Sequence, residues 1–427
     1  MHQRSFVRIA APLLVAAIAL TGCGSRSGGG SASGTSANSA NKIAVIGVIA
    51  PLTGDLSALG LGIKNSADLA IKKANQDKLI PGWTLQMQAE DDQATPATGQ
   101  QAASKLAGTS NVVGVVGNLN SNVAQSVQPV LDKANITMVS PANTNPSLTQ
   151  GPDPANKKRP YHVYFRTATT DAIQGPFAAN YVFQDLGIKQ VATVHDQKTY
   201  GQGLVAAFTT QFKKLGGTIV SAETINPQDQ DYSSTIAKLK AKGPKLVYYG
   251  GEYPQAGPLS QQMKSAGLNV PVMGGDGIYD PKFIALAGPA ANGDLATSVG
   301  APPEKLDSAK QFLADYKAAG YSDPYAAYGA YAYDAAWSII EALKQVLPNE
   351  TKIDDSVRQK VVAAMANVSF DGVTGHVGFD QYGDATSKVL TVYKVDNNAW
   401  VPAKTTGYSR AEQREFNRVP FAEISSH

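Results

Sequence analysis

The sequence has 427 residues, of which 43% are hydrophobic and a single one is a cysteine. Its 37 basic and 34 acidic side chains give a formal net charge of +3, and such near neutrality argues against nucleic acid as a partner. A chain of this length exceeds what one hydrophobic core organises, which indicates two domains.

The N-terminus has the pattern of a secretory signal. Arg4 and Arg8 form a basic region, and an apolar run of about a dozen residues follows. That run is too short to span a bilayer, which takes roughly 20 residues. Leu20-Thr-Gly-Cys23 ends the run and resembles a bacterial lipobox, in which the cysteine thiol receives a diacylglycerol. We predict a lipoprotein signal peptide over residues 1–22 and lipidation at Cys23; the alternative is a plain signal peptide with a stray cysteine.

The segment after the lipobox, residues 23–41, is rich in glycine and serine and is predicted to be a flexible tether. Removing residues 1–22 leaves 35 basic against 34 acidic side chains. With Cys23 modified, no disulfide and no cysteine-based metal site remain. The predicted protein is extracytoplasmic, anchored by lipid at the outer face of the cytoplasmic membrane or in the periplasm.

Apolar, β-branched runs alternate with helix-period segments through the first part of the chain. The predicted strands are 43–49, 84–90, 112–116 and 136–139, and the helices between them are 63–74, 96–106 and 123–133. The same alternation restarts after Tyr164-Phe165. Its strands are 190–194, 218–223, 246–249 and 270–273, and its helices are 173–186, 201–215, 232–242 and 255–266.

Two such series predict an α/β protein of two lobes, each with a parallel sheet covered by helices on both faces. Three further helices are predicted at 306–319, 325–347 and 355–365, and two strands at 389–395 and 399–405. A charged tail, 409–427, closes the sequence.

Ligands of open parallel sheets bind at the carboxyl ends of the strands. The loops there carry hydroxyls and amides in the first series, as in Asn120-Ser121 and Ser140-Pro-Ala142-Asn-Thr144. In the second series they carry Tyr200, Glu252 and Asp276. Helix N-termini and hydroxyls suit a carboxylate, and acidic side chains suit an ammonium. The pattern therefore favours a zwitterionic ligand.

The same loops resemble those of the leucine/isoleucine/valine-binding proteins, the type I periplasmic receptors of branched-chain amino-acid ABC transporters. The likeness runs from about Ile43 to Val395 and is strongest in three stretches: 138–149, 194–203 and 247–254. It implies two Rossmann-like lobes joined by three crossovers, near 167–170, 297–300 and 386–388. The implied division is 42–168 with 300–386 for lobe 1, and 169–299 with 387–408 for lobe 2.

The resemblance also assigns roles to the loop residues. Ser121 and Thr144 meet the ligand carboxylate, the carbonyl of Ala142 accepts from the ammonium, Tyr200 supports the ligand, and Asp276 pairs with the ammonium. Glu252 is included among the ligand-binding residues, although tyrosine is common at its position.

Leu59 also departs from the family pattern, since an aromatic is usual at its position. Thr95 and Asn120 replace the disulfide of Gram-negative members. The predicted function is capture of an amino acid, most simply a branched-chain one, for delivery to ABC permease subunits by a monomer without cofactor or metal.

Other solutes and another role stay open at this stage. The same fold binds polar or cationic amino acids, amides or urea, and a sensor ectodomain has the same lobes. An enzyme is not expected, because the sequence lacks a nucleophile elbow, a zinc-protease motif and a phosphate loop. No basic stretch interleaved with aromatics indicates nucleic-acid binding.

Overall fold

The computed structural model describes residues 42–407. The predicted signal peptide, tether and Cys23 lie outside the described residues, as does the predicted tail, 409–427.

The first sheet has five strands, all parallel, in the order β2-β1-β3-β4-β5. The strands are β1 (Lys42–Ala50), β2 (Trp83–Asp91), β3 (Val112–Gly117), β4 (Thr137–Ser140) and β5 (Tyr164–Arg166). The connecting helices are α1 (Ser57–Gln76), α2 (Pro96–Ala107), α3 (Ser121–Lys133) and the short α4 (Ser147–Gln150). Strand β3 is buried along its whole length, as expected of a strand with helices on both faces.

The second sheet has seven strands in the order β14-β13-β10-β9-β8-β6-β7. Its strands are β6 (Gln190–His195), β7 (Thr218–Thr224), β8 (Val247–Gly250), β9 (Val272–Gly274), β10 (Leu295–Val299), β13 (Val389–Asp396) and β14 (Ala399–Gly407). Its helices are α5 (Asp171–Asn180), α6 (Thr199–Lys214), α7 (Ser233–Lys242), α8 (Tyr253–Ser265) and α9 (Pro281–Ala287). The sheet is mixed, because β13 runs antiparallel to both β10 and β14.

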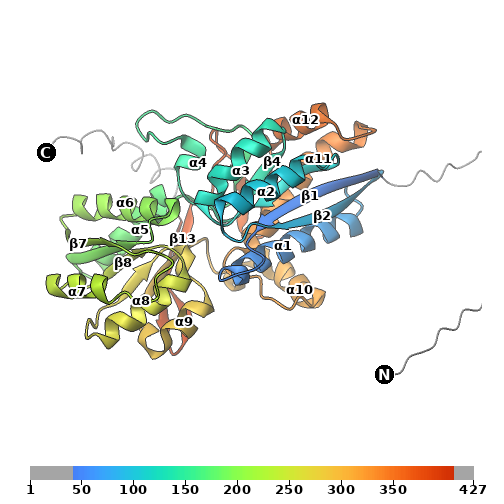
Figure 1. Cartoon of the computed structure of the whole chain (residues 1–427). Helices are drawn as coiled ribbons and strands as arrows, with labels where there is room; N and C mark the ends of the chain where they lie inside the picture. The colour runs from blue at the N-terminus through green and yellow to red at the C-terminus, as the bar shows by residue number, and fades with distance from the viewer. Residues whose placement is uncertain (1–41, 408–427) are drawn as a thin grey trace, which may run out of the picture. The chain divides into compact units, whose positions relative to one another are not determined.

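The chain passes between the two sheets three times. It leaves the first sheet after β5, returns to it after β10 and re-enters the second sheet at β13. The returning segment comprises α10 (Lys310–Ala319), α11 (Gly329–Val346), α12 (Asp355–Met365) and the hairpin β11 (Ser369–Gly372) with β12 (Gly375–Gly378). Helix α11 packs on α1, β3 and β4, so this late segment completes the cover of the first sheet (Figure 1).

Several boundaries differ from the sequence prediction. Helix α1 begins six residues before the predicted start at Ile63, because the small residues of Ser57-Ala-Leu-Gly-Leu-Gly62 pack closely. A Cβ at Gly60 would overlap the backbone of Pro51, and one at Gly62 the backbone of Tyr325. The helix predicted at 173–186 is α5 followed by a π-helical turn at Tyr181–Asp185. The earlier start of α1 brings Leu59 onto its first turns.

The end of β3 is shaped by Gly117. Its φ is +139°, and a Cβ there would overlap the carbonyl oxygen of Ile49 on the neighbouring strand. Glycine alone tolerates that approach, and it lets the chain turn out of the sheet directly into the segment Asn118–Ser121.

Candidate functional site

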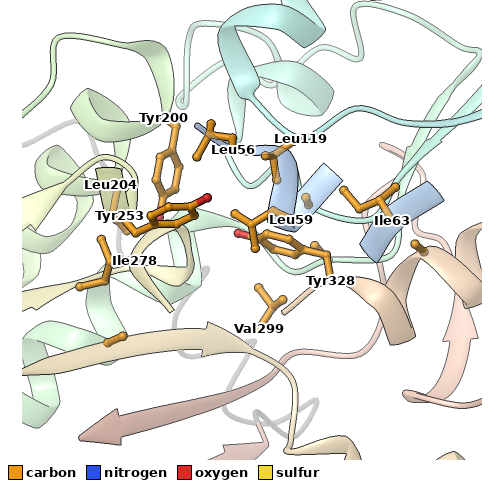
Figure 2. Close-up of a cluster of buried hydrophobic side chains, with 14 of the residues drawn as sticks. Leu56, Leu59, Ile63, Leu119, Tyr200, Leu204, Tyr253, Ile278, Val299 and Tyr328 are labelled. Carbon is orange, nitrogen blue, oxygen red and sulfur yellow. The ribbon is translucent and has the colours of Figure 1, made fainter. Parts of the chain in front are cut away.

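A cavity lies where the loops at the carboxyl ends of strands from both sheets meet. Its lining combines leucine and tyrosine side chains with two carboxylates and a serine hydroxyl; several of these side chains are drawn in Figure 2. The lining residues are Leu59, Leu119, Asn120, Ser121, Ala142, Tyr200, Glu252, Asp276, Gly277 and Tyr328. Five of the six predicted ligand-binding residues are therefore in the lining, and Thr144 is not.

One wall of the cavity is apolar. Leu59 on α1 and Leu119 after β3 are 1% and 7% exposed, and they belong to the same buried cluster as Tyr200 and Tyr328. Figure 2 shows Leu59 and Tyr328 among these side chains. Burial of aliphatic surface against such a wall is favourable at about 25 cal/mol per Å². The wall therefore suits an apolar group.

Asp276 supplies a buried carboxylate to the lining of the cavity. Its Oδ1 accepts hydrogen bonds from Gln174 Nε2 and Tyr200 Oη, both at 2.8 Å, and its Oδ2 accepts from Tyr328 Oη at 2.7 Å. Burial raises the pKa of Asp276, and these three donors offset only part of that effect. No basic side chain in residues 42–407 forms an ion pair with it. Its negative charge is available to a cation.

A second buried carboxyl group, Asp171, stands at the start of α5. The amide nitrogen of Gln174 donates to Asp171 Oδ1 at 3.0 Å as well as to Asp276, so one side chain links the two carboxyl groups. Burial and the nearby charge of Asp276 raise the pKa of Asp171 to about 8. At neutral pH Asp171 is therefore mostly protonated.

Ser121 is the first residue of α3 and is 1% exposed. Within the described residues its hydroxyl has no hydrogen-bond partner, although it lines the cavity. A buried hydroxyl without a partner is costly. The free N–H groups of the first turn of α3 lie beside it, and a helix N-terminus favours negative charge. Ser121 is thus placed to donate to an anionic group.

Thr144 is buried near the site but is not among the lining residues. Its carbonyl accepts from the backbone N–H of Asp171 at 2.8 Å, and within the described residues its buried hydroxyl has no hydrogen-bond partner. The loop that carries Ala142 and Thr144 is fixed by Arg166, whose Nη1 donates to the carbonyls of Asn143 and Asn145, each at 2.9 Å. The loop thus connects the cavity wall to the first crossover.

Glu252 lines the cavity but its carboxylate is already engaged. Oε2 pairs with Lys198 Nζ at 2.9 Å, and Oε1 accepts from Asn120 Nδ2 at 2.7 Å. Burial raises the pKa of Glu252, but the Lys198 charge and these hydrogen bonds bring it below its ordinary value. Asp196 Oδ2 lies 3.6 Å from Lys198 Nζ. Burial and the Glu252 charge raise the pKa of Asp196 to about 8. Glu252 is therefore ionised and neutralised.

Three residues of the site were not predicted from the sequence: Asp171, Gln174 and Tyr328. They come from the first crossover and from the segment before α11, not from loops that follow predicted strands. The spacing Asp171-x-x-Gln174 is a weak signal, since an acidic residue at a helix start is usual. Thr95 and Asn120, where the family's disulfide is absent, cap α2 and contact Glu252 respectively.

The described residues hold no group of three or more histidine, cysteine, aspartate or glutamate side chains arranged for a metal ion. Over the same part of the chain, no helix combines the length and apolarity needed to cross a membrane. The site is instead a closed set of hydrogen-bonding groups, one uncompensated carboxylate and an apolar wall, which is the arrangement of a binding site for a small solute.

Comparison of the sequence with known proteins shows the family to which the chain belongs. The model of the periplasmic binding protein family matches residues 44–399, and the chain belongs to this family of extracytoplasmic substrate-binding proteins. The chain is 33% identical over 357 residues to Leu/Ile/Val-binding protein homolog 3 of Brucella melitensis, covering 82% of this chain and 91% of that protein.

Two solved structures are similar over almost their whole length. A branched-chain amino acid transporter substrate-binding protein of Streptococcus pneumoniae, crystallised with isoleucine, has a TM-score of 0.75 and 25% identity, covering 86% of this chain and 100% of that one. A leucine-binding protein of Thermotoga maritima has a TM-score of 0.74 and 26% identity, covering 85% and 98%. The predicted family and the type I fold of two α/β lobes are confirmed.

Proposed function

We propose that this protein captures a branched-chain amino acid between two lobes outside the cytoplasm and delivers it to the permease of an ABC transporter. The observation that carries the proposal is one cavity with two complementary ends. Asp276 offers an uncompensated carboxylate, and Ser121 offers a free hydroxyl at a helix N-terminus. An α-ammonium and an α-carboxylate match these ends. The relatives named for leucine, isoleucine and valine support the same ligand class.

The lobes are proposed as residues 42–168 with 300–386 and residues 169–299 with 387–408. Ser121, Ala142 and Thr144 then belong to lobe 1, and Tyr200 and Asp276 to lobe 2. We assign the ligand carboxylate to Ser121 and Thr144, and the ammonium to the Ala142 carbonyl and Asp276. Because the two sets are on different lobes, only a closed conformation lets both touch one ligand.

The aliphatic side chain is assigned to the wall formed by Leu59, Leu119 and the ring of Tyr328. A cationic or strongly polar side chain is less suited, because Lys198 already neutralises Glu252, the second carboxylate of the lining. A charge buried without a partner is costly. Leucine, isoleucine and valine place no such charge in the cavity.

The remaining parts of the proposal follow from the sequence and the family. Cys23 is proposed as the lipid anchor and residues 23–41 as its tether, and the protein is proposed to act as a monomer without catalytic activity. The partners are the amino acid, the permease subunits and, through the lipid, the membrane. No nucleic acid and no cofactor take part.

Isothermal titration calorimetry with leucine, glutamine, lysine and acetamide tests the ligand class. Binding of leucine, with lysine and acetamide inactive, is the expected result. Binding of acetamide but of no amino acid would contradict the proposed ligand class. Small-angle scattering checks the mechanism: saturating leucine should reduce the radius of gyration, and an unchanged radius would contradict capture by closure.

A further inference from the structure

The partners of the Glu252 carboxylate come from both proposed lobes, but its charged partner comes from its own lobe. Lys198 and Asp196 belong to the same lobe as Glu252 and form a short loop, in which the backbone N–H of Lys198 donates to Asp196 Oδ1 at 3.0 Å. Asn120 alone belongs to the other lobe. The Glu252 carboxylate therefore has its ion-pair partner within its own lobe and receives one hydrogen bond from the other lobe.

The contact with Asn120 is a well-formed one. The distance from Asn120 Nδ2 to Glu252 Oε1 is 2.7 Å, and the two residues are only 3% and 4% exposed. Hydrogen bonds to charged acceptors in such surroundings are the stronger class. Asn120 also immediately precedes Ser121, so this contact stands beside the group assigned to the ligand carboxylate.

We propose that Glu252 is a latch between the lobes rather than a contact for the ligand side chain: its carboxylate, held by Lys198, receives Asn120 when the lobes close. The inference rests on the proposed function for its ligand, and it deepens that function by removing Glu252 from side-chain selection. The hydrogen bond of the latch stabilises the closed conformation. It places no requirement on the charge of the ligand side chain. Apparent affinity rises with the fraction of protein able to close.

Other contacts cross between the proposed lobes and provide a control. Asn145 Nδ2 donates to the carbonyl of Thr199 at 2.8 Å, and Tyr253 Oη donates to the carbonyl of Asp55. Thr199 Oγ1 donates to Gln125 Oε1 at 3.0 Å, but that pair is exposed. An exposed neutral hydrogen bond contributes little, so Gln125→Ala matches the latch in position across the lobes but not in strength.

The test is a swap of hydrogen-bond polarity. Asn120→Asp sets two carboxylates against each other, and Asn120→Asp combined with Glu252→Gln restores a donor and an acceptor in reversed order. Leucine affinity should fall roughly 10- to 100-fold in the single Asn120→Asp variant and recover most of that loss in the double variant. The Gln125→Ala control should change affinity by less than about twofold.

Two results would overturn the latch. One is a double variant as weak as Asn120→Asp alone, which would mean that the new charge repels the ligand directly. The other is a Glu252→Gln variant whose ratio of leucine to glutamine to lysine binding differs from that of the wild type, which would make Glu252 a side-chain contact.

A failure of the proposed function is distinguishable from a failure of the latch. If the wild type binds none of the amino acids, the function fails, and the latch is judged by scattering from the ligand-free proteins. The Asn120→Asp variant must then show a larger radius of gyration than both the wild type and the double variant. Equal radii would overturn the latch.

Discussion

Arg166 and Asp384 form an ion pair in which neither side chain reaches solvent. Arg166 Nε donates to Asp384 Oδ1 at 2.6 Å, and the exposed fractions of the two side chains are 0% and 1%. Although burial raises the pKa of Asp384, the Arg166 charge brings it below its ordinary value. The pair joins the end of β5 to the segment before β13, so it lies beside the first and third passages between the sheets.

We predict that Arg166→Met destabilises the protein by about 3–5 kcal/mol, because it leaves Asp384 buried without its ion-pair partner. It should also weaken leucine binding, since the carbonyls of Asn143 and Asn145, which flank Thr144, lose their common donor. Urea unfolding and calorimetry measure the two effects. The matched variant Arg166→Met with Asp384→Asn should recover part of the stability but not the affinity. Recovery of both would show that Arg166 does not position the loop.

The raised pKa of Asp171 predicts how stability depends on pH. The folded protein keeps a proton on Asp171 up to about pH 8, whereas the unfolded chain loses it near the ordinary aspartate pKa of 3.8. Between these values the folded state binds more protons, so this contribution to stability is full at low pH and is lost as pH rises through 8.

Asp171→Asn should therefore flatten the fall in unfolding free energy between pH 5.5 and 8.5, by at most about 1.4 kcal/mol per pH unit. Asp196 has a pKa raised to about 8 as well and contributes in the same direction, so part of the slope should persist. Urea titrations at several pH values in the absence of amino acids measure the slopes. An Asp171→Asn slope equal to that of the wild type would show that Asp171 titrates near its ordinary value.

Most of the fold could be predicted from the sequence because the buried strands are continuous apolar runs. Runs such as Val112–Val116 are apolar throughout, and parallel strands buried on both faces need nothing else. Strand β5 was missed because its three residues end in Arg166, and an arginine normally marks the surface. Its partner Asp384 lies 218 positions later, so no local pattern could show that the charge is compensated.

The candidate site could be predicted where residues follow a strand directly, as Ser121 and Asp276 do. The role of Glu252 was less accessible, because its environment depends on Lys198 and Asn120, which come from two other loops. Charge pairing between distant loops has no sequence period. Asp171 and Tyr328 were not predicted because neither lies in a loop that follows a predicted strand: Asp171 starts α5 and Tyr328 directly precedes α11.

The predicted anchor is tested by Cys23→Ala. Without the thiol no thioether to diacylglycerol can form, so the variant should leave the membrane fraction or accumulate as an unprocessed precursor. Fractionation followed by high-salt washing distinguishes a lipid anchor from electrostatic adsorption, which salt weakens. Cys23→Ser is the matched variant, since it keeps a small polar residue. Salt-resistant membrane association of either variant would rule out the lipid anchor.

The decisive position for ligand binding is Asp276. Asp276→Ala should weaken leucine binding by about 2–5 kcal/mol, the range for removing one partner of a buried charge pair. Asp276→Asn should lose nearly as much, because the amide keeps the shape but not the charge that an ammonium needs. Tyr328→Phe removes only one hydrogen-bond donor to the Asp276 carboxylate. It should therefore weaken leucine binding less than either Asp276 variant does.

The control for Asp276 is Asp280→Asn. Asp280 caps α9 by accepting from the backbone N–H of Lys282 at 2.7 Å, and an asparagine oxygen can do the same. It does not line the cavity, so leucine affinity should not change. Calorimetry on the wild type and the four variants against leucine gives the comparison. If Asp276→Asn bound leucine as tightly as the wild type, the ammonium would have to be held by another group, and the assignment of Asp276 would be wrong.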